Sequence, residues 1–382
     1  MPRTPEDVIN RLKTDVSLVR LVEDTGTKLT RQGKDYLGHC PFHDDKTPSL
    51  VVTPANNLWH CLGACNMGGS TIDWVMKSQG VSFKHAVEIL KQDPSSLAAN
   101  PVKTVPKLDN PISEDVDNQA VMQQVIRYYH TTLLASAEAQ EYLAKRGLDD
   151  KALIDTFKLG YANRTLGLRL PQKNRKAGEH IRKQLQNIGL YRTTGREHFA
   201  GSLVIPVMDE NDVITEIYGR KLLGNLRKGT PSHTYLPGAH AGVFNSKALK
   251  HTEEIILCEA LIDALTFWRH GFHYVTSSYG VNGLTDDIFK ALIQPHIKRV
   301  LIAYDRDAAG DKAANTAAKR LTEHGIDCFR IQLPQGMDVN DYALQATMPV
   351  KALGLIVRKA QWIGNGKAPS LPAGQPLPSL AA

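Results

Sequence analysis

Two closely spaced pairs of metal-ligating side chains near the N-terminus constrain the fold of this chain more than any other feature. Cys40 and His43 form the first pair, Cys61 and Cys65 form the second, and 17 residues lie between the pairs. Short knuckles at this separation are typical of a four-ligand zinc site. Three thiolates and one imidazole complete a tetrahedron and leave no position for a substrate. The sequence therefore predicts one structural zinc ion (Zn²⁺), in preference to a chance cluster of buried cysteines.

Composition frames this prediction without deciding the function. The chain has 382 residues, which is enough for two or three domains, and 42% of them are hydrophobic. A net charge of +7 is compatible with a nucleic-acid partner but does not require one. There is no secretory signal and no run of roughly 18 apolar residues, so we expect no membrane partner. Three of the five cysteines lie in the predicted zinc site, which favours a cytoplasmic location over a disulfide framework.

Sequence patterns divide the chain into five segments. Residues 1–92 combine short helices and strands around the predicted zinc site, and a unit this small gains stability from a metal. Residues 93–115 contain four prolines and predict a flexible linker. Residues 116–250 are mixed α/β, residues 251–346 alternate strand and helix, and residues 347–382 predict a short helix followed by a disordered tail.

Strand and helix alternate regularly from residue 254 onwards. Four apolar strands separated by three helices predict a parallel sheet with helices on both faces. The predicted fold class is therefore α/β. It combines a zinc-ribbon-like N-terminal domain, a mixed α/β region and a Rossmann-like parallel sheet.

Acidic residues follow the strands of this predicted sheet. Glu259 ends the first strand, Asp305 and Asp307 follow the third, and Asp338 lies in the loop after the last. Ligands bind beyond the carboxyl ends of parallel strands, so we expect these side chains to gather. Crowded carboxylates repel one another unless a cation neutralises them, and Mg²⁺ or Mn²⁺ is the natural occupant. The competing interpretation of Asp307 is a helix N-cap.

Three groups of motifs, in one order along the chain, resemble those of a known family. The first group is Cys40-Pro41-Phe42-His43, Lys46-Thr47-Pro48-Ser49 and Gly68-Gly69. The second is Tyr142-Leu143-Ala144-Lys145-Arg146-Gly147-Leu148, Phe157-Lys158-Leu159-Gly160-Tyr161-Ala162 and Gly219-Arg220. The third is Glu259, Asp305-Arg306-Asp307-Ala308-Ala309-Gly310 and Leu333-Pro334-Gln335-Gly336-Met337-Asp338. They resemble the zinc-binding domain, the start of the RNA polymerase domain and the Toprim catalytic domain of bacterial DnaG-type DNA primases.

This resemblance implies a DNA-directed RNA polymerase that makes short RNA primers on a single-stranded DNA template. The substrates would be ribonucleoside triphosphates, and the chemistry would be two-metal nucleotidyl transfer. Glu259, Asp305 and Asp307 would be catalytic and, together with Asp338, would hold Mg²⁺ or Mn²⁺. Glu259 could instead act as a general base. The basic residues that would hold template or nucleotide phosphates are Arg146, Arg196, Arg220 and Lys221.

The chain also departs from the family pattern. Three residues separate Cys61 from Cys65 where the family usually has two, and a lysine expected near Tyr235 is absent. The usual helicase-binding domain is not evident, which leaves a replicative helicase as an open partner and fits a compact version from a phage or other mobile element.

Other interpretations stay open at this point. A Toprim-type metal-dependent nuclease and a non-catalytic nucleic-acid-binding adaptor are the two alternatives to a primase. Within the zinc-binding domain, Trp59 and Phe42 could stack on template bases, although a place in the core is favoured.

Overall fold

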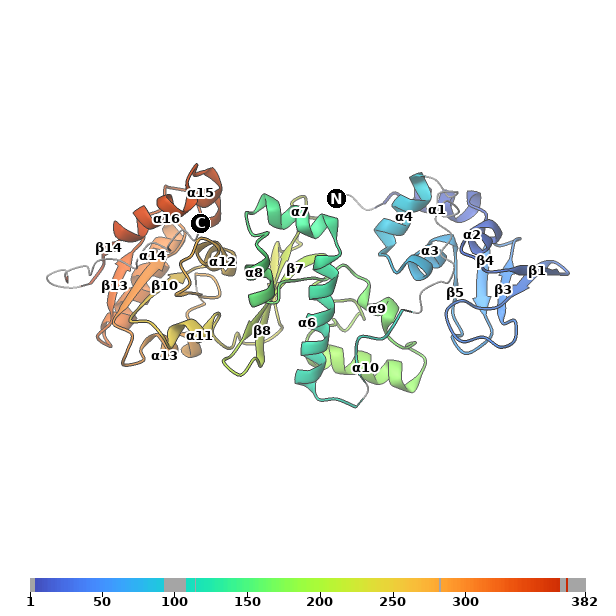
Figure 1. Cartoon of the computed structure of the whole chain (residues 1–382), viewed down its shortest axis with the longest axis horizontal. Helices are drawn as coiled ribbons and strands as arrows, with labels where there is room; N and C mark the ends of the chain where they lie inside the picture. Colours follow the sequence, from blue (N-terminus) through green and yellow to red (C-terminus); the bar gives the residue numbers. More distant parts are fainter. Residues whose placement is uncertain (1–3, 93–107, 114, 282, 365–368, 370–382) are drawn as a thin grey trace. The chain divides into compact units, whose positions relative to one another are not determined.

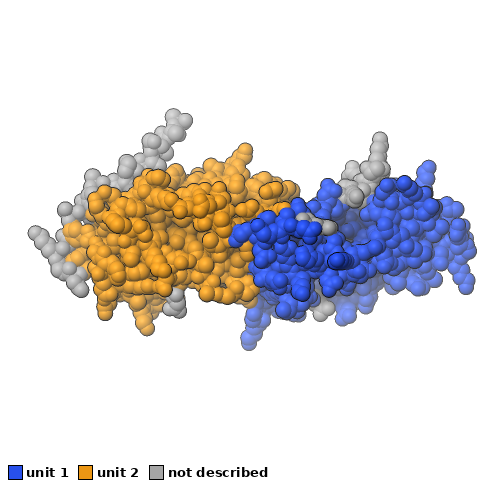
Figure 2. All heavy atoms as spheres, turned by 90° about the horizontal axis from the view of Figure 1, so that it is seen from below, with its two compact units in different colours: residues 1–121, 162–201, 223–230 blue, residues 122–161, 202–222, 231–382 orange. Residues whose placement is uncertain are grey.

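The computed structural model describes residues 4–92, 108–113, 115–281, 283–364 and 369. The chain forms two compact units, which Figure 2 colours separately. Unit 1 comprises residues 1–121, 162–201 and 223–230, and unit 2 comprises residues 122–161, 202–222 and 231–382. Most of the predicted linker (93–115) and of the predicted disordered tail falls outside the described residues. Within the described part of the chain, no helix is both long enough and apolar enough to cross a bilayer.

Unit 1 begins with a zinc-ribbon-like fold (Figure 1). Helices α1 (Glu6–Asp15) and α2 (Leu18–Asp24) precede an antiparallel sheet whose strands pair in chain order. The strands are β1 (Leu29–Gln32), β2 (Asp35–Gly38), β3 (Leu50–Thr53), β4 (Leu58–Cys61) and β5 (Gly68–Gly69). The helices that complete the unit are α3 (Thr71–Gln79), α4 (Phe83–Gln92), α9 (Leu166–Arg169) and α10 (Lys176–Asn187).

Three aromatic rings lie at the centre of the zinc-ribbon part. Phe42, Trp59 and Trp74 pack with ring centroids 4.9, 5.2 and 5.3 Å apart, in tilted and edge-to-face arrangements. Trp59 is 4% exposed and Trp74 is fully buried. Aromatic pairs of this kind contribute about 0.5–1.5 kcal/mol beyond the area they bury. The core interpretation of Phe42 and Trp59 is therefore confirmed.

A single side-chain amide joins the strands of unit 1 to its first two helices. Asn57, in the turn between β3 and β4, has a φ of 53°, which asparagine tolerates better than most residues. Its Nδ2 donates to the carbonyls of Lys13 and Val16 at 2.6 and 2.7 Å. Its Oδ1 accepts from the Leu18 N–H at 3.0 Å. The amide thus satisfies backbone groups at the helix ends that the helices themselves leave unpaired.

Unit 2 contains two sheets, and the first is antiparallel. Helix α6 (Asn118–Leu134), which starts in unit 1, leads into α7 (Ala137–Lys145) and α8 (Lys151–Thr156). The four strands pair in chain order. They are β6 (Gly160–Tyr161), β7 (Ser202–Met208), β8 (Ile214–Lys221) and β9 (His233–Tyr235).

The second sheet of unit 2 is the predicted parallel sheet, in the order β11-β10-β12-β13-β14. Its strands are β10 (Glu254–Cys258), β11 (Val275–Ser277), β12 (Arg299–Ala303), β13 (Asp327–Arg330) and β14 (Gln361–Trp362). The helices are α11 (Ser246–Leu249), α12 (Leu261–Arg269), α13 (Asp286–Leu292), α14 (Ala308–Thr322), α15 (Val339–Gln345) and α16 (Pro349–Arg358). The parallel pairing of the first four strands confirms the prediction, and β14 adds an antiparallel edge.

The order of the parallel strands fixes where a ligand can bind. The chain leaves β10 for β11 on one side and then continues to β12 on the other. In parallel sheets of this kind, ligands bind at such a switch point, beyond the carboxyl ends of the strands. The fold therefore places the residues that follow Cys258 and Ala303 at this switch point.

We predict that Asn57→Ala destabilises unit 1 by about 2 kcal/mol, because two carbonyls and one N–H lose their partner. Denaturant unfolding of the full chain, followed by tryptophan fluorescence, measures the change. Asn56→Ala is the matched control, since Asn56 is the exposed neighbour in the same turn. Equal midpoints for the two variants would show that the amide does not hold the helices.

Candidate metal centre and carboxylate site

The four predicted zinc ligands lie together in unit 1. The ligand atoms of Cys40, His43, Cys61 and Cys65 all lie within 4.8 Å of one another, and the three cysteines are buried. The sulfurs of Cys40 and Cys65 are 3.5 Å apart, and the Cys61 sulfur is 3.9 Å from Nδ1 of His43. A tetrahedral zinc with bonds of about 2.3 Å places two sulfurs about 3.8 Å apart. The side chains therefore fit a closed Cys-His-Cys-Cys zinc site, with three residues between Cys61 and Cys65 accommodated.

Electrostatics within this set favour a cation. The hydrogen bond from Cys40 lowers the pKa of Cys65 to about 5, so Cys65 carries a thiolate. The same hydrogen bond, together with burial, raises the pKa of the Cys40 thiol far above its usual range. Buried sulfurs this close cannot all ionise without a positive charge between them, and zinc supplies that charge.

A carboxylate outside the ligand set orients the first knuckle. Asp45 accepts the Cys40 N–H at 2.6 Å and the Ser49 hydroxyl at 2.8 Å, and it lies 3.3 Å from Nε2 of His43. Burial opposes ionisation of Asp45, but the hydrogen bonds from Cys40 and Ser49 outweigh it and lower the pKa. With Nε2 engaged by Asp45, Nδ1 of His43 is the nitrogen that faces the sulfurs. Such a carboxylate raises the basicity of a ligating imidazole.

The carboxylates predicted at the strand ends are neighbours in unit 2, but within the described residues only the Cys-His-Cys-Cys set is grouped closely enough to hold a metal as it stands. Glu259 follows β10, and its Oε2 accepts the N–H of Asp305, which follows β12, at 3.3 Å. Asp307 caps helix α14 by accepting the Gly310 N–H at 2.7 Å. Asp338 caps α15 in the same way. The N-cap interpretation of Asp307 is therefore confirmed, while its part in metal binding stays a prediction.

The ionisation of these acids shows how closely they crowd. Burial, and then the charges of Glu259 and Asp338, raise the pKa of Asp305 to about 6. Burial is also the main reason that the pKa of Glu259 is raised, and the charge of Asp307 adds to it. Each carboxylate thus makes the others harder to ionise, and a divalent metal bound among them would remove that penalty.

Sequence patterns missed a further acid beneath this site. Asp263, in the first turn of α12, is 3% exposed, and its Oδ1 accepts the Asn340 N–H at 3.3 Å. Burial, followed by the charges of Asp338 and Asp305, raises the pKa of Asp263 well above its usual range. Asp263 follows Glu259 by four residues, about one helical turn. This spacing could have identified Asp263, because it places both side chains on one side of the strand–helix junction.

Arg330, also missed, fixes the backbone that carries these acids. Its guanidinium donates to the carbonyls of Ile302, Tyr304 and Asp305 at 3.3, 2.7 and 2.9 Å. It also donates to the carboxylate of Asp311 at 3.0 Å. The side chain is 5% exposed, so this charge-assisted set is buried and strong. The end of β12 is therefore held in one geometry.

The four predicted phosphate-binding residues are distributed between the units. Arg146 of unit 2 donates to Oδ1 of Asn340 at 3.0 Å, and Asn340 Nδ2 donates back to the Arg146 carbonyl at 2.9 Å. This exchange places Arg146 beside Asn340, the residue that also bonds Asp263. Arg220 and Lys221 end strand β8 of the same unit, whereas Arg196 is exposed and belongs to unit 1.

The residues around Arg220 favour the charged form of its guanidinium. Burial opposes the guanidinium charge, but the neighbouring Tyr218 and Tyr142 outweigh it and raise the pKa of Arg220. Arg220 is therefore a cation at the end of β8.

We predict that Asp45→Asn weakens zinc retention by about 10- to 100-fold, because a neutral amide supports the His43 ring less well than a carboxylate does. Competition with a chromogenic chelator measures the loss on the zinc-loaded chain. Asp44→Asn, a change at the exposed neighbouring residue, is the control. Equal zinc release from the two variants would contradict the assigned contact.

We also predict that Asp305→Asn stabilises the zinc-loaded chain in the absence of other divalent metals. The folded-state pKa of Asp305 lies above the unfolded value of about 3.9, so its charge destabilises the fold increasingly as the pH rises from about 4, and fully above about pH 6. The gain at pH 8 should be about 1 kcal/mol after allowance for solvent screening, and about half of that at pH 5. Thermal unfolding at the two pH values measures it, with Glu323→Gln as an exposed control. A gain that does not depend on pH would contradict this assignment.

Comparisons with known proteins agree with the order of these sites. Residues 4–100 match the CHC2 zinc finger family, residues 128–249 match the DNA primase catalytic core N-terminal domain, and residues 256–343 match the Toprim-like family. DNA primase of Listeria monocytogenes is 27% identical over 380 residues, covering 92% of this chain and 58% of that protein. DNA primase of Aquifex aeolicus is 28% identical over 345 residues, covering 87% of this chain and 66% of that protein.

Solved primase structures share the fold of this chain. The structure of the zinc-binding and RNA polymerase domains of Aquifex aeolicus primase aligns with a TM-score of 0.53 and 25% identity, covering 94% of this chain and 86% of that one. The DnaG catalytic core aligns with a TM-score of 0.54 over 65% of this chain and 81% of that one, at 20% identity, which supports the fold alone. With a zinc ribbon, a primase core and a Toprim sheet in this order, the chain belongs to the DnaG-type primase family.

Proposed function

We propose that this chain is a DNA primase, a DNA-directed RNA polymerase that joins ribonucleotides on a single-stranded DNA template. The observation that supports this most is the gathering of Glu259, Asp263 and Asp305 at the switch point of the parallel sheet. Partly buried carboxylates that lie near one another beyond the ends of parallel strands are suited to hold divalent metals for phosphoryl transfer. The chain spans about 58% of the Listeria relative, so the activity is inferred from the site as well as from the family.

In this proposal the acids of unit 2 hold Mg²⁺ or Mn²⁺. Bound there, the metals offset the negative charge that develops on the triphosphate. Glu259, Asp305 and Asp307 would be the principal ligands, with Asp338 beside them. Alternatively, Glu259 would serve as a general base for the 3′-hydroxyl, because burial raises its pKa and so makes its carboxylate a stronger base.

Basic residues of unit 2 would position the nucleotide and the template. Arg146 is held against Asn340, and Arg220 keeps its charge beside Tyr218 and Tyr142, so each offers a guanidinium to a phosphate. Lys221, next along β8, and Arg196 of unit 1 would contribute further positive charge.

Residues 1–92 would read the template, while residues 116–346 carry out the chemistry. A DnaG primase catalytic domain has been solved bound to single-stranded DNA, which supports the template as partner. A reducing cytoplasm suits the buried thiols of the zinc site. A replicative helicase is a further candidate partner, because primers are needed where a duplex is opened.

We predict that Asp305→Ala and Asp307→Ala each lower primer synthesis by at least about 10²–10³-fold while the fold is retained, as removal of a comparable electrostatic group does. The assay supplies single-stranded template, ribonucleoside triphosphates and Mg²⁺, and it resolves short RNA products on a gel. Glu323→Gln, at the far end of α14, should leave synthesis unchanged.

The same assay separates the alternatives. Nicked DNA without RNA would identify a Toprim-type nuclease. Template binding without either product, unaffected by Glu259→Gln, would identify an adaptor. Near-normal synthesis by Asp305→Ala would remove that residue from the active site.

A further inference from the structure

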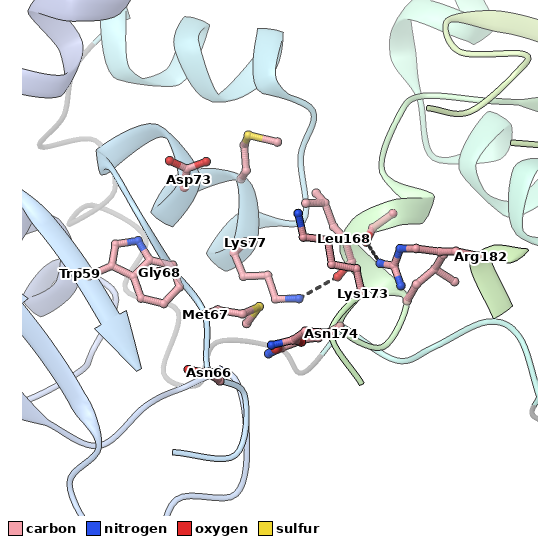
Figure 3. Close-up of a pocket in the computed structure, with 14 residues that line it drawn as sticks. Trp59, Asn66, Met67, Gly68, Asp73, Lys77, Leu168, Lys173, Asn174 and Arg182 are labelled. Atoms are coloured by element: carbon pink, nitrogen blue, oxygen red, sulfur yellow. Dashed lines mark hydrogen bonds between the residues drawn. The ribbon is translucent and has the colours of Figure 1, made fainter. Parts of the chain in front are cut away.

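Unit 1 contains a cavity that the proposed chemistry does not use. It has a volume of about 360 Å³ and lies between the β4–α3 region and the segment around α9 and α10. Figure 3 shows Trp59 on one side, Lys77 near the middle, and Leu168, Lys173 and Arg182 on the other side. A cavity of this size falls in the range of small-molecule sites. The carboxylate site belongs to the other unit, so the two are separate.

The walls of the cavity are apolar on one part and cationic on another. Met67, Met76 and Leu168 supply flexible apolar surface beside the indole of Trp59. Methionine sulfur and an indole are favourable neighbours for a flat aromatic ring. This part of the wall therefore suits a planar, partly apolar group.

Three cations contribute to the same walls. The Lys77 amine donates to the Leu168 carbonyl at 2.7 Å, and burial lowers the pKa of Lys77. Arg182 donates to the carbonyls of Pro171, Gly178 and Gly167, which fixes its guanidinium. Lys173 is exposed and makes no hydrogen bond within the described part of the chain, so its amine can reach a ligand.

The one acidic residue in the wall is already engaged. The carboxylate of Asp73 accepts the N–H of Ser70 at 2.8 Å and its hydroxyl at 2.6 Å, as the cap of α3. Three cations against one acid leave the cavity positive, so it attracts an anion rather than a metal. The apolar wall further requires that the anion carry a planar group.

We propose that this cavity binds one nucleoside phosphate, with the base against Met67 and Met76 and the phosphate at Lys77 and Lys173. The volume admits one nucleotide and excludes a duplex. The inference rests on the proposed function only for the source of the ligand, because a primase meets both free nucleotides and a DNA strand. Either source presents the same base and phosphate.

Isothermal titration of the full, zinc-loaded chain tests this inference. The probes are ATP and a 5′-phosphorylated oligothymidylate, in buffer without Mg²⁺ or Mn²⁺, so that the carboxylate site lacks its metals. Lys173→Ala should weaken binding of the favoured probe about tenfold, the effect of losing one charged hydrogen bond. Lys183→Ala, an exposed change on α10 that is not part of the cavity wall, should alter it less than about twofold. Binding of ATP alone identifies a free nucleotide, and binding of the oligonucleotide alone identifies a strand.

A second variant separates the cavity from general surface charge. Met67→Trp fills the apolar part without changing the charge, and it should abolish binding of the favoured probe. Unchanged affinity in Met67→Trp, equal losses in Lys173→Ala and Lys183→Ala, or no binding by the unmodified chain would each overturn the inference. Asp305→Ala should bind as the unmodified chain does, so its loss of primer synthesis reports on the proposed function separately.

Discussion

The guanidinium of Arg330 holds the part of the chain on which the carboxylate site depends. The carbonyls of Ile302, Tyr304 and Asp305, at and just after the end of β12, accept its N–H groups. Its positive charge offsets part of the repulsion between the acids around it. A buried charge that lost these partners would cost several kcal/mol, so removal of any one of them destabilises this strand end. The strand order brings Glu259 to the same place, and Asp263 extends the cluster into the core. The carboxylate site of unit 2 is thus built on one fixed strand end.

The two units treat negative charge in opposite ways. In unit 2, buried carboxylates raise one another's pKa and repel any phosphate until a metal is bound. In unit 1, Lys77 and Arg182 are held by backbone carbonyls, which leave their charge in place. A nucleotide would therefore be attracted to unit 1 without a metal and to unit 2 only with one. The difference arises because the fold buries carboxylates in unit 2 and cations in unit 1, each with too few opposite charges nearby to neutralise them.

The sequence predicted those features that depend on residues close together in the chain. The zinc ligands followed from spacing alone, because each knuckle is a short turn, and the parallel sheet followed from the alternation of apolar strands with helices. The contacts of Asp45, Asn57 and Arg330 could not be predicted, since each depends on partners that only folding brings near. Strand β14 was missed for the same reason, because two residues gain strand geometry only by pairing with β13.

The way the chain is threaded between its two units affects the order in which it can fold during synthesis. Strand β6 ends at Tyr161, but its partner β7 begins at Ser202, so the first sheet of unit 2 waits for the ribosome to release some forty residues that belong to unit 1. Domains generally fold as they emerge, and a strand without its partner exposes an unpaired edge. The segment 162–201 must therefore leave the ribosome before that edge is covered, and a ribosome pause within it would prolong the exposure of an aggregation-prone intermediate. Replacing residues 162–201 by those of a relative would change part of unit 1 and, at the same time, the connection between β6 and β7 of unit 2.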